Sequence, residues 1–334
     1  MPDGRFAPSP TGDLHLGNLR TALLAWLAAR RDGGRSLVRM EDLDQVVARP
    51  EVEARQLDDL RTLGLTWDGE VVRQSERRDR YDAAIAQLDA AGLVYPCYCT
   101  RREIQEAASA PHGDAPDGAY PGTCRDLTAT QRRAREETGR PPALRLRADG
   151  VRVAFVDRVA GPYEGLVDDV VVRRNDGTPA YNLAVVVDDA AQGIAEVVRG
   201  DDLLSSTPRQ LHLAALLGLA APAHAHVPLV LGPDGRRLAK RDGPVTLAER
   251  LDRGEAVPEV LGRLASSAGL VPPGTLVEPG DLGALAASFT FALLDRRPWR
   301  FPLDDGEPHP DASDDRPTAP GRAPGTEPGT APGT

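Results

Sequence analysis

A short amino-terminal stretch combines residue types that could bind a phosphate group. Residues 5–12 read Arg-Phe-Ala-Pro-Ser-Pro-Thr-Gly, and His15 and Asn18 follow closely. Proline fixes its own φ and pushes the preceding residue toward an extended backbone, which makes this stretch a stiff elbow. Leucines at positions 16, 19, 23 and 27 recur at helical spacing, so His15 and Asn18 stand at a helix amino terminus, where free N–H groups attract anions. We predict a nucleotide-binding loop; the alternative is a proline-rich connection before an amphipathic helix.

An acidic run follows the next apolar segment. Residues 36–40, Ser-Leu-Val-Arg-Met, are predicted to form a buried strand, and Glu41 and Asp42 come directly after it. Open α/β sheets bind ligands at the carboxyl ends of their strands, which makes Glu41 a candidate binding residue. Acidic residues in this position also cap the helix that follows, and the sequence leaves that alternative open.

Cys97, Cys99 and Cys124 are the chain's three cysteines. An odd number of clustered thiols suits a metal better than disulfides. Zn²⁺ is held tetrahedrally and needs a fourth ligand, for which residue chemistry favours His112, because imidazole is a common zinc ligand. No neighbouring acid has the spacing of a zinc hydrolase, so we expect a structural site. The alternative is three buried free cysteines.

Lys240 is the only lysine among the 40 lysine and arginine residues of the chain. A compact ammonium and a planar guanidinium are not interchangeable, so a chain that otherwise uses arginine has a chemical reason to keep this lysine, unless it stands there by chance.

Composition limits the class of protein. The chain has 334 residues, of which 41% are hydrophobic, enough for one large core or two modest ones. Its net charge of −10 argues against broad adhesion to nucleic acid, so any RNA contact is expected to be local. We find no signal peptide and no apolar run of about 18 residues, and we expect a cytoplasmic protein.

The remaining pattern predicts the elements that position these groups. Helices are expected over 50–64, 75–92, 245–253, 257–268 and 281–295, and over 207–217, where Thr207 would begin a capping box. Alternation predicts an antiparallel pair of strands over 143–147 and 153–156, and a turn over 175–178 joins strands predicted over 170–174 and 180–187. His224 and His226 precede a strand over 227–231, and we interpret them as surface or ATP-edge residues. The Pro/Gly-rich tail from about 302 is expected to be disordered.

Four motifs in order resemble the glutamyl branch of the class I aminoacyl-tRNA synthetases. The elbow resembles the opening of that family, and residues 15–18, His-Leu-Gly-Asn, stand in the place of its His-Ile-Gly-His signature, from which Asn18 departs. Residues 39–42 resemble its Arg-Ile-Glu-Asp run. Residues 181–189 and 196–202 resemble its second substrate wall. Residues 237–241, Arg-Leu-Ala-Lys-Arg, resemble its Lys-Met-Ser-Lys-Ser loop, with Lys240 in the place of the lysine that meets the ATP phosphates.

The resemblance implies an α/β fold: a Rossmann-like nucleotidylyl transferase core with a zinc-bearing insert and a short helical carboxy-terminal part. The implied division places the halves of the catalytic domain at 1–95 and 166–245, the insert at 96–165, the helical part at 246–300 and the tail at 301–334. Relatives carry a Cys-x-Cys, Tyr-x-x-x-Cys zinc insert, which favours Tyr120 over His112 as the fourth ligand beside the three cysteines.

The resemblance also implies the site residues. His15, Asn18 and Lys240 would be catalytic, and with Gly17 they would bind ATP, used as a substrate with Mg²⁺. The implied pocket for L-glutamate has Glu41 on the ammonium group and arginines on the carboxylates. Its residues are Arg5, Phe6, Ala7, Pro8, Ser9, Glu41, Tyr181 and Arg199.

The residues after the lysine loop leave little room for the large helical anticodon-binding region of a complete glutamyl-tRNA synthetase. The chain therefore resembles the truncated paralogues that activate glutamate and attach it to queuosine in the anticodon of tRNA(Asp). The expected partners are glutamate, ATP and the anticodon arm of tRNA(Asp), with no membrane, and the chain is expected to be a monomer. The alternatives are a ligase acting on a tRNA 3′ end and a non-catalytic tRNA- or adenylate-binding relative.

Overall fold

The computed structural model describes residues 2–100, 102–104, 119–238, 242–243 and 245–302. The predictions for His112, for Lys240 and for the tail beyond 302 therefore fall outside the described residues. Among the described residues, no helix is both long and apolar enough to cross a membrane.

The described part of the chain is organised around a five-stranded parallel sheet in the order β10-β9-β1-β2-β3. The strands are β1 (Gly4–Phe6), β2 (Ser36–Met40), β3 (Val72–Arg73), β9 (Glu196–Gly200) and β10 (Ala223–Val227). From β1 the chain proceeds to β2 and β3 on one side, and the later strands β9 and β10 continue the sheet on the other. The strand order thus reverses between β1 and β9, and ligands bind at such switch points.

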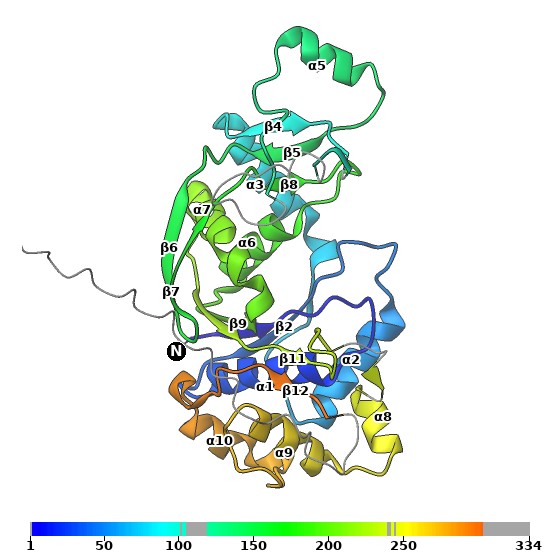
Figure 1. The fold of residues 1–334 in the computed structure, drawn as a ribbon, viewed down its shortest axis with the longest axis vertical. Coiled ribbons are helices and arrows are strands. Elements are labelled where there is room, and N and C mark those ends of the chain that lie inside the picture. The colour runs from blue at the N-terminus through cyan, green and yellow to red at the C-terminus, as the bar shows by residue number, and fades with distance from the viewer. Residues whose placement is uncertain (1, 101, 105–118, 239–241, 244, 303–334) are drawn as a thin grey trace, which may run out of the picture. The chain divides into compact units, whose positions relative to one another are not determined.

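Helix α1 (Leu16–Arg30) joins β1 to β2 and carries the main core on its leucines. These leucines are fully buried, as the helical spacing predicts: Leu16, Leu19, Leu23 and Leu27. Helices α9 (Val257–Ser267) and α10 (Leu282–Ser288) pack against α1 (Figure 1). The predicted strand at 36–40 and the predicted helix beginning at Leu16 are both confirmed.

The other predicted helices are present, some shorter than expected. They are α2 (Pro50–Thr62), η1 (Gln74–Arg77) with α3 (Arg78–Ala90), α7 (Thr207–Leu217) and α8 (Leu247–Asp252), while η5 (Phe291–Leu293) completes the segment that α10 begins. The short helix η2 (Asp201–Ser206) leads directly into α7, and η4 (Pro279–Asp281) leads directly into α10. Strands β11 (Val230–Leu231) and β12 (Trp299–Arg300) pair in parallel.

Two antiparallel sheets lie outside the parallel sheet. One has the order β4-β5-β8, with β4 (Val94–Cys97), β5 (Ala143–Leu146) and β8 (Val171–Arg173), and the other is the hairpin of β6 (Arg152–Asp157) and β7 (Gly161–Leu166). The prediction that 143–147 pairs with 153–156 is wrong, because β5 lies between β4 and β8 and β6 pairs with β7. Figure 1 shows α5 (Ala129–Glu136) beyond the three-stranded sheet and the hairpin running beside α7.

The prediction of a strand over 180–187 is also wrong. These residues begin α6 (Tyr181–Gln192), which packs on α3 and α7. The β-branched run Val185–Val187 favours a strand locally, but tertiary packing outweighs such a preference. Gly193 ends the helix with a positive φ of 69°, which is the usual glycine signal for a helix end.

Candidate active site

A cavity of about 450 Å³ opens at the switch point of the parallel sheet. It is bordered by the elbow after β1, the start of α1, the ends of β2 and β9, and the start of α6. The sequence-predicted residues that line it are Arg5, Phe6, Ala7, Pro8, Ser9, His15, Gly17, Asn18, Glu41, Tyr181 and Arg199. The residues predicted to bind glutamate and those predicted to bind the nucleotide thus line one cavity. The exception is Lys240, which falls outside the described residues.

Backbone hydrogen bonds hold the elbow against the sheet. Pro8 accepts a hydrogen bond from the backbone N–H of Glu41 at 2.9 Å, which ties the elbow to the end of β2. The Gln56 side chain donates to the carbonyls of Ser9 and Gly12, at 3.1 and 2.7 Å. The elbow therefore keeps Ser9 beside Glu41 without help from a ligand.

His15 stands at the start of the first helix, as the sequence predicts, and it caps that helix. Its Nδ1 accepts a hydrogen bond from the backbone N–H of Asn18, and Asn18 Oδ1 accepts one from the N–H of His15, both at 3.2 Å. A Cβ at position 17 would lie 2.9 Å from the imidazole, so glycine is required for this ring position. Burial and the nearby guanidinium of Arg237 lower the pKa of His15 to about 4. The neutral ring therefore carries its proton on Nε2, as a hydrogen-bond donor.

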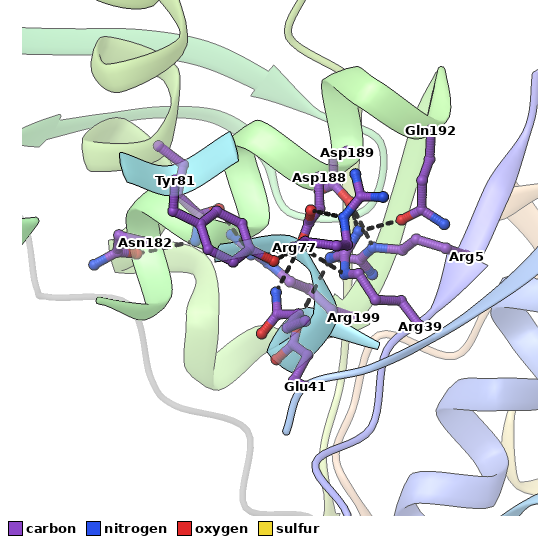
Figure 2. Close-up of polar contacts among 12 residues, drawn as sticks. Arg5, Arg39, Glu41, Arg77, Tyr81, Asn182, Asp188, Asp189, Gln192 and Arg199 are labelled. Carbon is purple, nitrogen blue, oxygen red and sulfur yellow. Dashed lines mark hydrogen bonds and ion pairs between the residues drawn. The ribbon is translucent and has the colours of Figure 1, made fainter. Parts of the chain in front are cut away.

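The end of the cavity with the predicted glutamate-binding residues Arg5 and Glu41, called the amino-acid end below, is supported by buried ion pairs. Figure 2 shows them around two consecutive aspartates of α6. Asp189 accepts hydrogen bonds from Arg5 Nε at 3.3 Å and from Arg39 Nη1 at 2.6 Å. Asp188 accepts from groups on η1 and α3, namely Gln74, Arg77 and Tyr81. Opposite charges at these distances fix the guanidinium of Arg5.

The structural roles of Arg39, Asp188 and Asp189 were missed by the sequence reasoning. Arg39 and Glu41 are two residues apart in the sequence, but Arg39 shares a sheet face with Arg5 only after β1 and β2 pair. The sequence pattern predicted the two aspartates at the end of a strand, where their side chains would point to opposite faces of the sheet. In a helix, adjacent side chains lie about 100° apart, so both can be buried against different elements.

Glu41 lies at the wall of the cavity with its carboxylate incompletely neutralised. Arg39 Nη2 approaches Glu41 Oε1 at 3.4 Å, a long contact. Burial raises the pKa of Glu41, while the guanidinium groups of Arg39 and Arg5 oppose that shift. A cationic ligand group beside Glu41 would stabilise the ionised carboxylate, as an ammonium group would.

Arg199 is a buried cation held by neutral acceptors. It donates from Nε to His226 Nε2 at 3.0 Å, from Nη1 to Gln210 Oε1 at 2.8 Å and from Nη2 to Thr207 Oγ1 at 2.8 Å. Burial lowers the pKa of this guanidinium. Within the described residues no carboxylate forms an ion pair with Arg199, so an anionic ligand would supply the missing charge.

Two predictions are corrected here. Thr207 is not the residue that caps α7, because Ser206 precedes the helix and the Thr207 hydroxyl bonds Arg199 instead. His224 and His226 are not surface residues, because both lie in β10 with no more than 5% of their area exposed. The two histidines belong to a strand that begins at Ala223, earlier than the predicted strand over 227–231.

Tyr181 forms a partition between two cavities. It also lines a neighbouring cavity of about 720 Å³, which Glu41, Cys97, Cys99 and Arg174 border as well. The cavity lined by the predicted glutamate-binding residues and the cavity lined by Cys97 and Cys99 therefore meet at Tyr181, the first residue of α6.

Described residues before and after positions 239–241 of the predicted lysine loop lie near His15. Before these positions, Arg237 lines the 450 Å³ cavity at the switch point, called the main cavity below, and donates a hydrogen bond to Asp202 at 3.0 Å. On the far side, the carbonyl of Val245 accepts a hydrogen bond from the N–H of Leu16 at 2.7 Å, and Thr246 bridges to His15. The described residues on either side of 239–241 thus reach the start of α1.

The cysteines gather around the phenol of Tyr120. The three Sγ atoms lie within 4.8 Å of one another, and Tyr120 Oη is 3.4 Å from Cys97 Sγ and 3.6 Å from Cys99 Sγ. A tetrahedral zinc site with bonds of about 2.3 Å separates its sulfur ligands by about 3.8 Å. The spacing of these four groups fits such a site, and three thiols are ligands that zinc favours.

Residues 3–274 match the family described as tRNA synthetases class I (E and Q), catalytic domain. The chain therefore belongs to the class I tRNA synthetases, as the Rossmann-like sheet and the motifs around the cavity indicate, and within them to the glutamyl-Q tRNA(Asp) synthetases. A glutamyl-Q tRNA(Asp) synthetase of Nocardia farcinica is 63% identical over 89% of this chain and 92% of its own length. Another from Symbiobacterium thermophilum is 50% identical over 90% of this chain and 96% of its own length.

A solved structure has the same fold. The glutamate tRNA ligase of Elizabethkingia meningosepticum, in complex with its amino acid, superposes with a TM-score of 0.75 at 27% identity. The match covers 90% of this chain and 67% of that ligase.

Proposed function

We propose that this chain activates L-glutamate with ATP and transfers the glutamyl group to queuosine in the anticodon of tRNA(Asp). The relatives named glutamyl-Q tRNA(Asp) synthetase support the product, glutamyl-Q on tRNA(Asp). The observation that carries the proposal is one cavity with two buried arginines and a glutamate at one end and a helix amino terminus at the other. Two cations and one anion match a diacid that carries one amine.

At the amino-acid end, Glu41 binds the ammonium group, Arg5 holds one carboxylate and Arg199 holds the side-chain carboxylate. The ion pair of Arg5 with Asp189 uses Nε, which leaves N–H groups at the other edge of the guanidinium for a ligand. Ser9 and Tyr181 border the space between, and Phe6, Ala7 and Pro8 form the wall. A bound glutamate is thereby fixed at both ends.

The first step is in-line attack by the α-carboxylate of glutamate on the α-phosphate of ATP. A carboxylate oxygen forms a bond to phosphorus, and the bond to the leaving pyrophosphate breaks, which gives glutamyl-adenylate. His15 and Asn18 lie where the phosphates meet the start of α1, and Lys240 stabilises charge on them. Mg²⁺ bound with ATP supplies further charge neutralisation. Positioning and electrostatics suffice for this chemistry, so no residue forms a covalent intermediate.

The second proposal is a structural zinc ion held by Cys97, Cys99, Cys124 and Tyr120. The distances among the three thiols and the phenol support it, and His112 is the rival fourth ligand. Metal analysis of the purified chain is expected to give one zinc per chain. Replacing Tyr120 by Phe should weaken zinc retention against a chelator, whereas His112→Ala should not; the reverse result would make His112 the ligand.

ATP–pyrophosphate exchange across the twenty amino acids, without tRNA, tests the activation step. We expect exchange with glutamate alone. Absence of exchange with every amino acid would instead leave a non-catalytic relative. The acceptor is then identified by charging tRNA with labelled glutamate and mapping the label. Label in the anticodon supports the proposal, while label at the 3′ end would identify a glutamate–tRNA ligase.

A further inference from the structure

Asp157 is the last residue of β6, where the chain enters the turn of the β6–β7 hairpin. It lies outside the cavity, and its side chain is completely buried against the parallel sheet. Its Oδ1 accepts hydrogen bonds from the backbone N–H groups of Val159, Ala160 and His226, at 2.9, 2.8 and 3.0 Å. Its Oδ2 lies 2.6 Å from His226 Nδ1. Although burial opposes the shift, these hydrogen bonds lower the pKa of Asp157 to about 2. The carboxylate is therefore ionised.

An ionised carboxylate at this position determines where His226 carries its proton. Asp157 Oδ2 can only accept, so the imidazole proton sits on Nδ1. Nε2 is then an acceptor, and it faces Arg199 Nε at 3.0 Å. Burial lowers the pKa of His226, with Asp157 opposing and Arg199 reinforcing the shift. The ring is therefore neutral.

The sheet makes this arrangement rigid. In the parallel pairing of β9 and β10, His226 lies directly beside Arg199. The ring of His224 stacks on that of His226, with centroids 5.9 Å apart. The imidazole has no other rotamer available without breaking these contacts, so its Nε2 holds the Nε edge of Arg199 in one plane.

We propose that Asp157 and His226 are positioning residues that orient the Arg199 guanidinium toward the side-chain carboxylate of the substrate. The inference rests on the proposed function, because it assigns Arg199 to that carboxylate. With Nε tied to His226, and Gln210 and Thr207 on the outer N–H groups, the orientation of the guanidinium plane is fixed before the ligand arrives. Asp157 acts on selectivity through two intermediaries and never touches the substrate.

The relay predicts an unusual effect for an isosteric change. In Asp157→Asn, three backbone N–H groups require the carbonyl oxygen at the Oδ1 position, which places the NH₂ group against His226 Nδ1. The imidazole proton must then move to Nε2, where it faces the N–H of Arg199. The variant keeps its shape and hydrogen-bond count at the hairpin but loses the acceptor that orients Arg199.

Two variants of the histidine separate its two contacts. The amide of His226→Asn occupies the place of Nδ1, which keeps the contact with Asp157 and removes the one with Arg199. The longer side chain of His226→Gln places its oxygen near Nε2 and keeps the acceptor for Arg199. Glu196→Gln is the matched control, because it neutralises another buried carboxylate on the strand of Arg199. Glu196 pairs with Arg31 and with Arg158 of the hairpin turn, and it does not line the cavity.

Steady-state ATP–pyrophosphate exchange measures the KM values for glutamate and for ATP in the four variants. We expect Asp157→Asn and His226→Asn to raise the KM for glutamate by about tenfold or more, with the KM for ATP within about threefold of wild type. His226→Gln should stay within about threefold for both, and Glu196→Gln should match wild type. Discrimination of glutamate against glutamine should fall in the first two variants only.

Nitrogen NMR of histidine-labelled protein reads the tautomer independently of activity. We expect an Nδ1–H tautomer for His226 in wild type and an Nε2–H tautomer in Asp157→Asn. An unchanged tautomer, or KM values that rise equally for glutamate and ATP, would overturn the relay. Wild-type protein without glutamate-dependent exchange would overturn the proposed function instead, and the NMR signals would still report whether Asp157 sets the proton position.

Discussion

The two ends of the main cavity are built by different means. The amino-acid end is a network of buried charges in which Arg5 and Arg39 are paired with Asp189, with Arg199 left without a carboxylate partner among the described residues. At the end predicted to bind the nucleotide, Gly17 and the neutral imidazole of His15 border the cavity, and the N–H groups of Leu16 and Asn18 are bonded to Val245 and His15. One end is organised by ion pairs across the sheet and the other by the local geometry of a helix start.

Under the proposed function, this contrast separates substrate recognition at one end of the cavity from stabilisation of the reacting phosphates at the other. Fixed, pre-paired charges recognise a substrate in its ground state, whereas charge that develops on phosphate during the reaction must be met by groups placed at the phosphates. Under the proposed function, that charge is met by Lys240 and by Mg²⁺. Changes at one end should therefore alter the KM for glutamate, and changes at the other should alter the turnover of ATP.

The largest effect is expected for Lys240→Ala. Removal of one donor that stabilises transition-state charge should lower the exchange rate by about 10²–10³. The KM for glutamate should stay near the wild-type value, because the amino-acid end is unchanged. Lys240→Arg is the control that keeps the charge and should retain more activity. Unchanged exchange in Lys240→Ala would remove the lysine from the mechanism.

Glu41→Gln should produce the next largest effect, and at the opposite end. Loss of a hydrogen bond between charged groups should lower kcat/KM for glutamate by about 10–100-fold, with the KM for ATP unchanged. Initial rates at varied glutamate and fixed saturating ATP measure it. Asp32→Asn is a matched control, because among the described residues this exposed acid pairs with neighbouring Arg31 alone. An equal change in both KM values would contradict the division of the cavity.

Gly17→Ala tests the nucleotide end without removing a functional group. The new Cβ would lie 2.9 Å from the imidazole of His15 and 3.2 Å from Val230, so the ring must shift. We expect kcat/KM for ATP to fall by about tenfold, since small displacements of positioned groups are costly. Gly283→Ala in α10 serves as the control, because its added Cβ meets no atom within 4 Å and the residue does not line the cavity. A normal ATP response in Gly17→Ala would show that the ring position is unimportant.

The smallest effect is expected from the titration of His15. Its pKa is lowered to about 4, so the imidazole becomes a cation only as the pH falls toward that value. The ratio of wild type to His15→Gln in kcat/KM for ATP should therefore stay constant between about pH 6 and 8. A cationic clamp would make that ratio rise as the pH falls through about 6.5. A rising ratio would make the nucleotide end more like the charged amino-acid end.

The sequence predicted the nucleotide end better than the amino-acid end, and the reason is range. The elbow, the first helix and the place of His15 and Asn18 at its start depend on interactions within a few residues, which spacing reveals. The reciprocal cap between His15 and Asn18 was not predicted. The pairing of Arg39 with Asp189 joins residues 150 positions apart, and no local pattern announces it. Glu41 was a candidate from its place at the end of a strand, whereas Tyr181 and Arg199 were expected at the cavity only because of the family motifs.

Local preference also failed where packing decided the structure. The valines before Asp188 favour a strand, yet burial against α3 and α7 makes this segment a helix. His226 alternates with His224 as an exposed strand would, but the buried carboxylate of Asp157 covers it from another sheet. The division of the chain into its predicted parts stays a prediction.

The adjacent aspartates of α6 connect two layers of the molecule. Asp189 bonds the arginines of β1 and β2, while Asp188 bonds Arg77 and Tyr81 and also lies 3.8 Å from Arg39 Nε. Each residue added to or removed from a helix turns everything beyond it by about 100°. During evolution α6 can therefore exchange many of its side chains, but a one-residue insertion or deletion ahead of Asp188 would misalign both aspartates at once.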